Sequence, residues 1–296
     1  MQESINDFLN YLTLEKKYSD YTEVNYEIDL DKYLKFLQAN QKKYLHVKVQ
    51  DISAYIVYLK KSGFKSTSIN RNLSTLRSFY NYLIFKKQVD LNPVDLVRGL
   101  KTEKKLPNYF KYEEFLAMLE VTKEKTSLNI RNQMILELLL ATGLRVSELA
   151  SIKLSELDIN ERQLKVLGKG QKERIVFFGN HAKTAINAYL ADARSLLLKN
   201  KTSEYLILNH LGNKITDRGI RLVIEDIIKK TAIVSKVSPH TFRHTFATMM
   251  LNSGANIKSV QELLGHASLN TTSIYTHLTN EEIRRSYLNA HPRAKK

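Results

Sequence analysis

The sequence predicts a mainly α-helical protein with a small antiparallel β-sheet in its C-terminal domain. Apolar residues recur at three- and four-residue spacing along most of the 296 residues, which is typical of amphipathic helices. The convincing strand-like segments, separated by short turns, lie between about residues 157 and 178. A charged connector that contains a proline interrupts the pattern at residues 99–108. We therefore expect a helical domain over residues 1–98, a linker over 99–108 and a second domain over 109–296.

Within the first domain the apolar pattern predicts four amphipathic helices. Their inward-facing residues are expected to be Ile5, Phe8, Leu9 and Leu12; Leu30, Tyr33, Leu34 and Leu37; Ile52, Tyr55, Ile56 and Leu59; and Ile69, Leu73, Leu76, Phe79 or Tyr80, and Leu83. Ser66 or Thr67 is expected to cap the fourth helix. Lys65, Arg71 and Arg77 lie near or along that helix, where they could contact DNA phosphates, although an ordinary solvated face fits them equally well.

The second domain is expected to begin with helices over about residues 112–121 and 130–141, the latter apolar enough to be its central helix. Gly143 is a natural C-cap for that helix, because glycine readily adopts the left-handed conformation. Arg145 follows at the junction with the next helix. Glu148, three residues later, could hold the Arg145 guanidinium or a nearby imidazole in place.

Three short strands follow, expected at residues 157–160, 163–167 and 174–178. Lys169 lies between two glycines at the tip of the second hairpin, which is ordinarily a solvated turn position. In a phosphoryl-transfer site the same position would let an ammonium group approach a leaving oxygen. Two helices and a short strand between them are expected next, at residues 182–198, 217–231 and 205–208.

The residues with the most distinctive chemistry gather in the last quarter of the chain. Ser238 followed by Pro239 predicts a helix start, since a hydroxyl caps the first turn and proline lacks only an N–H that has no partner there. His240, Arg243 and His244 then share one face of this helix.

Two later segments add to this set. A helix after Asn256 is expected to stop at Gly265, which places His266 in a turn. A short helix from about residue 270 carries Tyr275. Two histidines, an arginine and a tyrosine can therefore converge from three connected segments.

The last predicted helix begins with a capping box formed by Thr279 and Glu282. It is followed by a basic tail over residues 291–296.

Three interpretations of this cluster compete. Each residue taken alone is most simply a packed core or surface group. A metal site is suggested by the four-residue spacing of His240 and His244, but Thr241 stands where a metalloprotease has glutamate, and Arg243 would place a positive charge beside the metal. An anion site, in which arginine and imidazole donors hold a phosphate while the Tyr275 hydroxyl attacks it, uses every residue.

Composition favours an anionic partner inside the cell. The chain has 46 Lys and Arg against 30 Asp and Glu, a net charge of +16, so nucleic acid is the first candidate. The absence of cysteine excludes disulfides and thiolate sites and fits a reducing cytoplasm. No apolar run is long enough to span a bilayer, and the N-terminus lacks signal-peptide features, so we expect a cytoplasmic protein without membrane contact.

Taken in order, five motifs resemble the signature of the tyrosine recombinase (phage integrase) family: Arg145 with Val146-Ser147-Glu148-Leu149, Gly168-Lys169-Gly170, His240-Thr241-Phe242-Arg243-His244, Leu264-Gly265-His266, and Tyr275-Thr276-His277. The helical N-terminal region resembles that family's core-binding domain. The ending Ala290-His291-Pro292-Arg293-Ala294 resembles the Xer recombinases, nearest the XerC/CodV branch.

This resemblance implies an enzyme that cuts and rejoins DNA through a 3′-phosphotyrosine, without ATP, metal or other cofactor. It implies six catalytic residues and one supporting residue, namely Arg145, Lys169, His240, Arg243, His266 and Tyr275 as nucleophile, with Glu148 in support. The arginines would hold the oxygens of the scissile phosphate, and the histidines would assist Tyr275 and bond to the phosphoryl group. Lys169 would protonate the leaving 5′ oxygen.

The resemblance also implies partners. Two domains would clamp duplex DNA, and the last helix would dock on a neighbour in a tetramer, formed with copies of this chain or with a XerD-like recombinase. Resolution of chromosome dimers at dif-like sites during cell division, with a FtsK-like translocase as activator, is the implied role. A phage or mobile-element integrase, a type IB topoisomerase and a non-catalytic DNA-binding relative are the alternatives.

Overall fold

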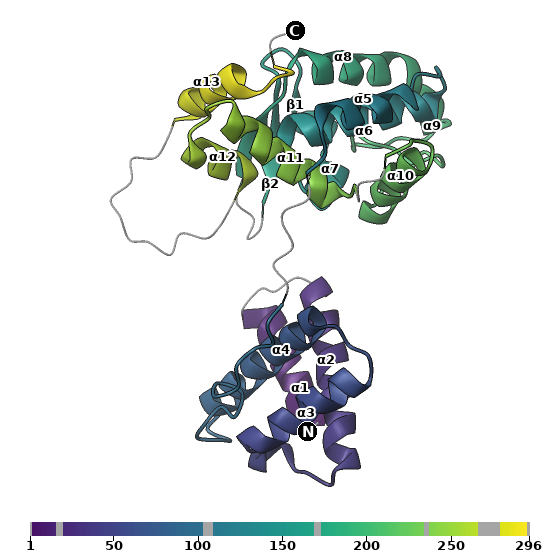
Figure 1. Cartoon of the computed structure of the whole chain (residues 1–296). Coiled ribbons are helices and arrows are strands. Elements are labelled where there is room, and N and C mark those ends of the chain that lie inside the picture. The colour runs from purple at the N-terminus through teal and green to yellow at the C-terminus, as the bar shows by residue number, and fades with distance from the viewer. Residues whose placement is uncertain are drawn as a thin grey trace. The chain divides into compact units, whose positions relative to one another are not determined.

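The computed structural model of the protein (Figure 1) describes residues 2–15, 20–102, 109–168, 173–233, 237–265 and 279–294. Lys169, His266 and Tyr275 therefore lie outside the described residues. The chain divides into two compact units, Met1–Lys104 and Lys105–Lys296, and each is described on its own. In the part of the chain that the structure covers, no helix is long and apolar enough to cross a membrane.

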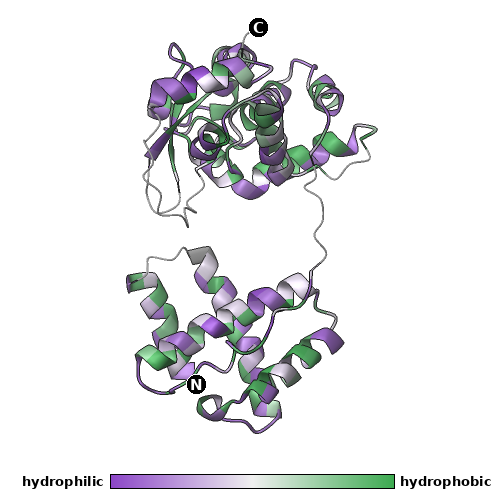
Figure 2. Cartoon of the chain, turned by 60° about the vertical axis from the view of Figure 1, so that its left-hand side comes forward, coloured by the Kyte–Doolittle hydropathy of each residue, from purple (hydrophilic) through white to green (hydrophobic). Residues whose placement is uncertain are grey.

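The first unit consists of helices around an aromatic core. Its elements are α1 (Gln2–Asn10), the π-helix η1 (Tyr11–Glu15), α2 (Asp20–Ala39), the 3₁₀-helix η2 (Tyr44–His46), α3 (Val49–Lys61) and α4 (Ser66–Phe85). In Figure 2 the helices of this unit carry both hydrophobic and hydrophilic residues, as amphipathic helices do. In the core, the hydroxyl groups of Tyr33 and Tyr80 lie 2.9 Å apart, and Tyr80 donates to the backbone oxygen of Tyr44 at 2.9 Å.

The inward faces predicted for these helices are confirmed except at one position, and the predicted N-cap of α4 is wrong. On α2 the side chain of Leu34 is only half-buried, and Phe36 takes the buried position instead. The N-cap of α4 is Lys65, without a side-chain cap, and not Ser66 or Thr67. The helix begins one residue earlier because the backbone of Lys65 already accepts the first helical hydrogen bond, from the amide of Ile69.

The second unit is built around one buried helix. Its elements are α5 (Tyr112–Glu120), α6 (Ser127–Thr142), α7 (Val146–Ser151), the 3₁₀-helix η3 (Leu154–Glu156), β1 (Leu157–Asp158), β2 (Gln163–Leu167), β3 (Glu173–Phe177), α8 (Asn180–Ala188), the π-helix η4 (Tyr189–Ala193), α9 (Arg194–Leu198), α10 (Asp217–Lys229), α11 (Pro239–Asn252), α12 (Ile257–Leu264) and α13 (Asn280–Ala290). Every residue of α6 from Met134 to Thr142 is buried, and this helix packs against α8, α10, α11 and β3. The predicted central helix and mainly α fold class are confirmed.

The sheet has the order β1-β2-β3 with antiparallel neighbours. Leu164 on β2 pairs with Val176 on β3, and both side chains are buried in the core beside α6. The strand expected at residues 205–208 was a wrong prediction. That segment forms only two isolated bridges, Lys153 with Tyr205 and Leu208 with Lys214, so the backbone pairing does not extend into a ladder.

The basic segment that follows α13 packs against the core of the second unit. Arg293 is buried and its Nε donates to the carboxylate of Glu137 on α6 at 3.0 Å, while its Nη1 donates to the hydroxyl of Tyr112 at 2.7 Å. His291 is also buried, and its Nε2 lies 3.2 Å from the backbone oxygen of Leu140. Residues 291–294 therefore return to the core helix and fix the end of α13.

Candidate active site

The turn between α6 and α7 positions Arg145. Gly143 ends α6 in the left-handed conformation, with φ of 61°, as predicted. Arg145 is the N-cap of α7, and its backbone N–H donates to Oε2 of Glu148 at 2.9 Å. The Nη1 of Arg145 donates to Oε1 of the same carboxylate, also at 2.9 Å. One glutamate therefore caps the helix and directs the guanidinium, which confirms the expected contact between Arg145 and Glu148.

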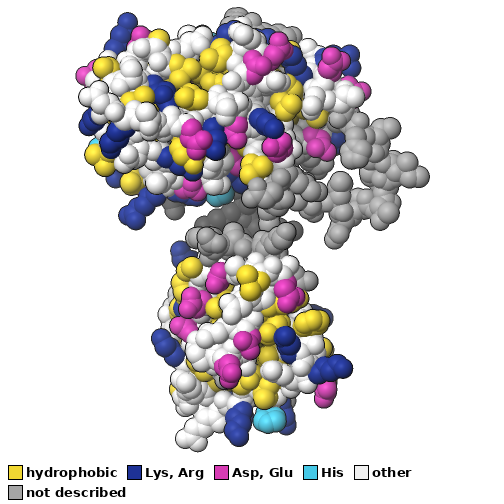
Figure 3. Space-filling model, turned by 180° about the vertical axis from the view of Figure 1, so that it is seen from behind, with side chains coloured by type: hydrophobic (Ala, Val, Ile, Leu, Met, Phe, Trp, Pro, Cys, Tyr) yellow, Lys and Arg dark blue, Asp and Glu magenta, His cyan; other side chains and the backbone are white. Residues whose placement is uncertain are grey.

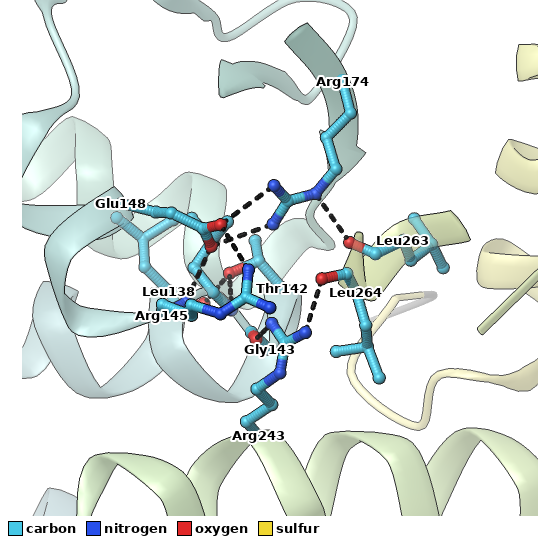
Figure 4. Close-up of polar contacts among 10 residues, drawn as sticks. Leu138, Thr142, Gly143, Arg145, Glu148, Arg174, Arg243, Leu263 and Leu264 are labelled. Atoms are coloured by element: carbon cyan, nitrogen blue, oxygen red, sulfur yellow. Dashed lines mark hydrogen bonds and ion pairs between the residues drawn. The ribbon is translucent and has the colours of Figure 1, made fainter. Parts of the chain in front are cut away.

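Sequence reasoning missed the second arginine that holds Glu148. Figure 4 shows Arg174, on β3, forming a two-pronged ion pair with this carboxylate, with Nη1 3.0 Å from Oε1 and Nη2 2.9 Å from Oε2. The Nε of Arg174 donates to the backbone oxygen of Leu263 on α12 at 3.1 Å. Burial alone would raise the pKa of Glu148, but the hydrogen bonds from Arg174 and from the Arg145 backbone outweigh it and hold the pKa below its usual range.

Arg243 reaches the same place from α11. This helix begins as predicted, with the Ser238 hydroxyl accepting from the backbone N–H of Thr241 and Pro239 in the first turn. The Nη1 of Arg243 donates to the oxygen of Gly143 at 2.9 Å, and its Nη2 donates to the oxygen of Leu264. Burial, and then the nearby charge of Arg145, lower the pKa of Arg243 to about 10, so it remains cationic at neutral pH.

A small pocket brings three predicted site residues together. It has a volume of about 100 Å³, and Arg145, His240 and Arg243 line it with the start of α7 and with Asp217 and Arg221 of α10. The contribution of α10 was not foreseen, because nothing in its sequence pattern distinguishes Arg221 from a solvated arginine. His244 is exposed and does not line this pocket.

A larger pocket of about 570 Å³ adjoins the first. Arg145 and Glu148 line one part of it and Gly168 another. Gly168 is the last described residue before Lys169, so this pocket connects the start of α7 with the base of the hairpin on which Lys169 was predicted.

The structure leaves three of the predicted catalytic residues undescribed but defines their neighbours. Gly265 ends α12 in the left-handed conformation, with φ of 64°, so His266 comes directly after this cap. Tyr275 lies between α12 and α13. The predicted capping box of Thr279 and Glu282 at the start of α13 is confirmed. On α12, Val260, Leu263 and Leu264 are buried, whereas Ile257 is exposed.

The three predicted DNA-binding residues lie on the first unit in different surroundings. The Lys65 side chain is exposed at the start of α4. Arg71 donates to the buried carboxylate of Asp29 at 2.9 Å, and Arg77 pairs with the exposed Asp95 at 3.2 Å. Basic and acidic side chains are interspersed over both units on the face shown in Figure 3, so the basic excess does not gather there.

Among the residues that the structure describes, no group of three or more His, Asp or Glu side chains could hold a metal ion.

Comparison with known proteins decides the family. Residues 108–282 match the model of the phage integrase family, and residues 5–87 match the phage integrase N-terminal SAM-like domain. The chain belongs to the phage integrase family. It is 44% identical over 289 residues to the tyrosine recombinase XerC of Staphylococcus aureus strain JH9, covering 98% of this chain and 96% of that protein. The resemblance inferred from the motifs is confirmed, and the protein is a Xer-type tyrosine recombinase, an enzyme that cleaves and rejoins DNA at specific sites.

Two solved structures of lambda integrase share the fold. A dimer of residues 75–356 bound to a COC' core site is 17% identical with a TM-score of 0.67, covering 94% of this chain and 99% of that one. A tetramer bound to a Holliday junction is 18% identical with a TM-score of 0.66, covering 93% of this chain and 80% of that one.

Proposed function

We propose that this recombinase cleaves duplex DNA with Tyr275 as nucleophile and resolves chromosome dimers at a dif-like site during cell division. The observation that carries the chemical part is the pocket of about 100 Å³ lined by Arg145, His240 and Arg243. Its volume and its cationic donors suit a single phosphate group. The cellular part is supported by the identity to proteins named XerC.

Hydrogen bonds within the protein hold a guanidinium donor of this pocket in place before DNA binds. Arg243 uses two of its five N–H groups on the carbonyls of Gly143 and Leu264. The remaining groups, with those of Arg145, are available for the two non-bridging oxygens of the scissile phosphate. Guanidinium groups fixed in this way stabilise the extra negative charge of a pentacoordinate transition state without reorganising.

The proposed reaction exchanges one phosphate ester bond for another. The Tyr275 oxygen attacks phosphorus, with His240 assisting removal of the phenolic proton, and the bond from phosphorus to the 5′ oxygen breaks. Lys169 gives that oxygen a proton, and His266 bonds to the phosphoryl group. A free phenol has a pKa of about 10, so the proton must be drawn off by a base and by the arginine charges. A second 5′ hydroxyl then reverses the step and exchanges strands.

We further propose that residues 1–98 and 109–296 contact DNA together, with Lys65, Arg71 and Arg77 on phosphates. The active assembly would be a tetramer, of this chain alone or with a XerD-like partner, under a FtsK-like translocase. Lambda integrase bound to a Holliday junction as a tetramer supports this assembly through the shared fold.

The test is covalent capture. The protein is incubated with a nicked duplex carrying a candidate dif-like site, with EDTA and without nucleotide, and the products are separated on a denaturing gel. We expect a protein–DNA adduct on the 3′ side of the break. Tyr275→Phe should bind the duplex without forming the adduct, whereas Tyr109→Phe, a change at an exposed tyrosine of the same unit, should form it normally.

The outcomes separate the alternatives. An adduct that survives in Tyr275→Phe would show that another residue is the nucleophile. Binding by the unaltered protein without any adduct would favour the non-catalytic alternative. Equal adduct formation on dif-like and unrelated sequences would contradict the proposed chromosomal site.

A further inference from the structure

A fully buried aspartate lies between α2 and α4 in the first unit. The side chain of Asp29, on α2, has no exposed surface. Its Oδ1 accepts from Nη2 of Arg71 on α4 at 2.9 Å and lies 3.5 Å from Nζ of Lys32. Its Oδ2 accepts from the hydroxyl of Thr75 at 3.2 Å. Burying a carboxylate is costly unless donors surround it, and here three donor side chains do so.

The Arg71 guanidinium connects this buried carboxylate to the protein surface. Its side chain is 45% exposed, and its Nη1 donates to Oδ1 of Asn25 at 3.2 Å. Asn25 stands one helical turn before Asp29, so both residues reach Arg71 from the same face of α2. These bonds use two of the five N–H groups of Arg71. The other three have no protein partner among the described residues and are available to a ligand at the surface.

We infer that Asp29 is a positioning residue for DNA binding, whose buried carboxylate holds the Arg71 guanidinium ready for a DNA phosphate. This inference rests on the proposed function, in which Arg71 contacts a phosphate. Asp29 does not touch DNA itself, because its side chain is fully buried. A long side chain loses rotamer freedom when it binds, and a guanidinium already fixed by Asp29 and Asn25 loses less.

The inference predicts an effect on DNA affinity opposite to the one expected from charge alone. An aspartate near DNA repels the phosphates, so replacing it with a neutral residue ordinarily strengthens binding. Asp29→Asn should instead weaken binding, because a neutral amide oxygen holds a guanidinium less firmly than a carboxylate does. We expect the affinity to fall roughly 3- to 10-fold, as the loss of one charge-assisted hydrogen bond implies.

The test measures the affinity of the full-length protein for a candidate dif-like duplex at several salt concentrations, with EDTA present, by fluorescence anisotropy. Arg71→Gln should weaken binding and reduce the slope of log K against log salt by about one, because one phosphate contact is lost. Asp29→Asn should reduce both quantities in the same direction. The double variant should bind no more weakly than Arg71→Gln alone, because Asp29 acts through Arg71.

Asp95→Asn is the matched control. Asp95 also pairs with an arginine of α4, Arg77, at 3.2 Å, but its side chain is 55% exposed. An exposed ion pair fixes its partners weakly, and Arg77 keeps its bond to the Val94 oxygen. This variant removes the same charge, so it should bind DNA at least as tightly as the unaltered protein. If Asp29→Asn does so too, the inference is overturned.

A second variant covers the case in which Asp29→Asn folds poorly. Asn25→Ala removes the other hydrogen bond to Arg71 and leaves the buried carboxylate in place. It should also weaken binding, and it should add nothing to the effect of Arg71→Gln. A partly folded sample binds less DNA at every salt concentration but keeps the slope. Lower affinity of Asp29→Asn with an unchanged slope, together with normal binding by Asn25→Ala, would therefore overturn the inference.

Failure of the proposed function gives different results. If Arg71→Gln binds as tightly as the unaltered protein, Arg71 makes no phosphate contact, and this inference falls with that part of the proposal. If the unaltered protein does not bind the duplex at all, the proposed function itself is contradicted.

Discussion

At the residue scale, two buried ionisable side chains, Glu148 and His291, show how hydrogen-bond partners determine whether a buried group is charged. Burial opposes the charged form of both groups. Glu148 receives hydrogen bonds from Arg174 and Arg145 and keeps a lowered pKa, so it stays ionised. Among the described residues, His291 forms hydrogen bonds with the Leu140 oxygen and the Arg293 backbone, and burial lowers its pKa to about 4. It is therefore neutral in the folded protein.

The protonation of His291 predicts a loss of stability in acid. An unfolded histidine has a pKa near 6.5, so between pH 6.5 and 4 the unfolded chain binds a proton that the folded chain excludes. Its contribution is complete above pH 6.5 and falls as the pH drops toward 4. We expect the free energy of unfolding to fall by ~2 kcal/mol from this group between pH 7 and 5.

Urea unfolding at the two pH values measures this difference. His291→Gln should lose the pH-dependent part, even if its stability at pH 7 is lower. His210→Gln, at an exposed histidine, should retain it. An unchanged pH dependence in His291→Gln would show that other groups produce it.

At the element scale, the turn from α6 to α7 both packs against the core and positions an arginine of the proposed active site. Gly143 has a positive φ, and a Cβ there would lie 2.6 Å from the ring of Phe246. Its oxygen also accepts from Arg243. We expect Gly143→Ala to cost roughly 2–5 kcal/mol, from backbone strain together with overpacking. Adduct formation should fall further than DNA binding, because the displaced Gly143 oxygen no longer holds the Arg243 guanidinium in position.

Gly254 provides the matched control for this change. It has a positive φ after α11, but nothing lies within 4 Å of a Cβ built there. Gly254→Ala should cost only ~1–2 kcal/mol and leave cleavage unchanged. Equal effects of the two changes would mean that strain alone explains Gly143→Ala.

These elements also show what the sequence could predict. Ser238 with Pro239, Gly143 and the Thr279 capping box act through the nearest few residues, so local pattern located them. Arg174 could not be found in this way, because its partners lie 26 and 89 residues away along the chain. Its position in a strand depends on tertiary packing, which no periodicity reports. The strand expected at residues 205–208 did not form, since a short apolar run predicts burial but does not supply the partner strand that a ladder needs.

At the scale of the whole molecule, the catalytic unit is closed by its own C-terminal segment. Helix α13 packs on α11, α12 and β3, and Arg293 then reaches Glu137, 156 residues earlier. Burial raises the pKa of Glu137, and the charge of Arg293 opposes that rise. The segment that contains Tyr275 is therefore followed by a helix fixed at both ends within the same chain, by the Thr279 cap and by residues 291–294.

Removing the Arg293 side chain should lower the free energy of unfolding substantially, because it leaves the buried Glu137 carboxyl group without its partner. We expect Arg293→Gln to cost ~3–5 kcal/mol and to lower the melting temperature by roughly 6–20 °C. Arg284→Gln removes a partly exposed ion pair between α13 and Glu161 and should cost less than about 1 kcal/mol. The double change Glu137→Gln with Arg293→Gln should recover part of the loss, since no unpaired charge remains. Calorimetry on Glu137→Gln, on Arg293→Gln and on the double variant measures these losses. If the stability losses of the two single variants add up to the loss of the double variant, Arg293 stabilises the fold by packing rather than through Glu137.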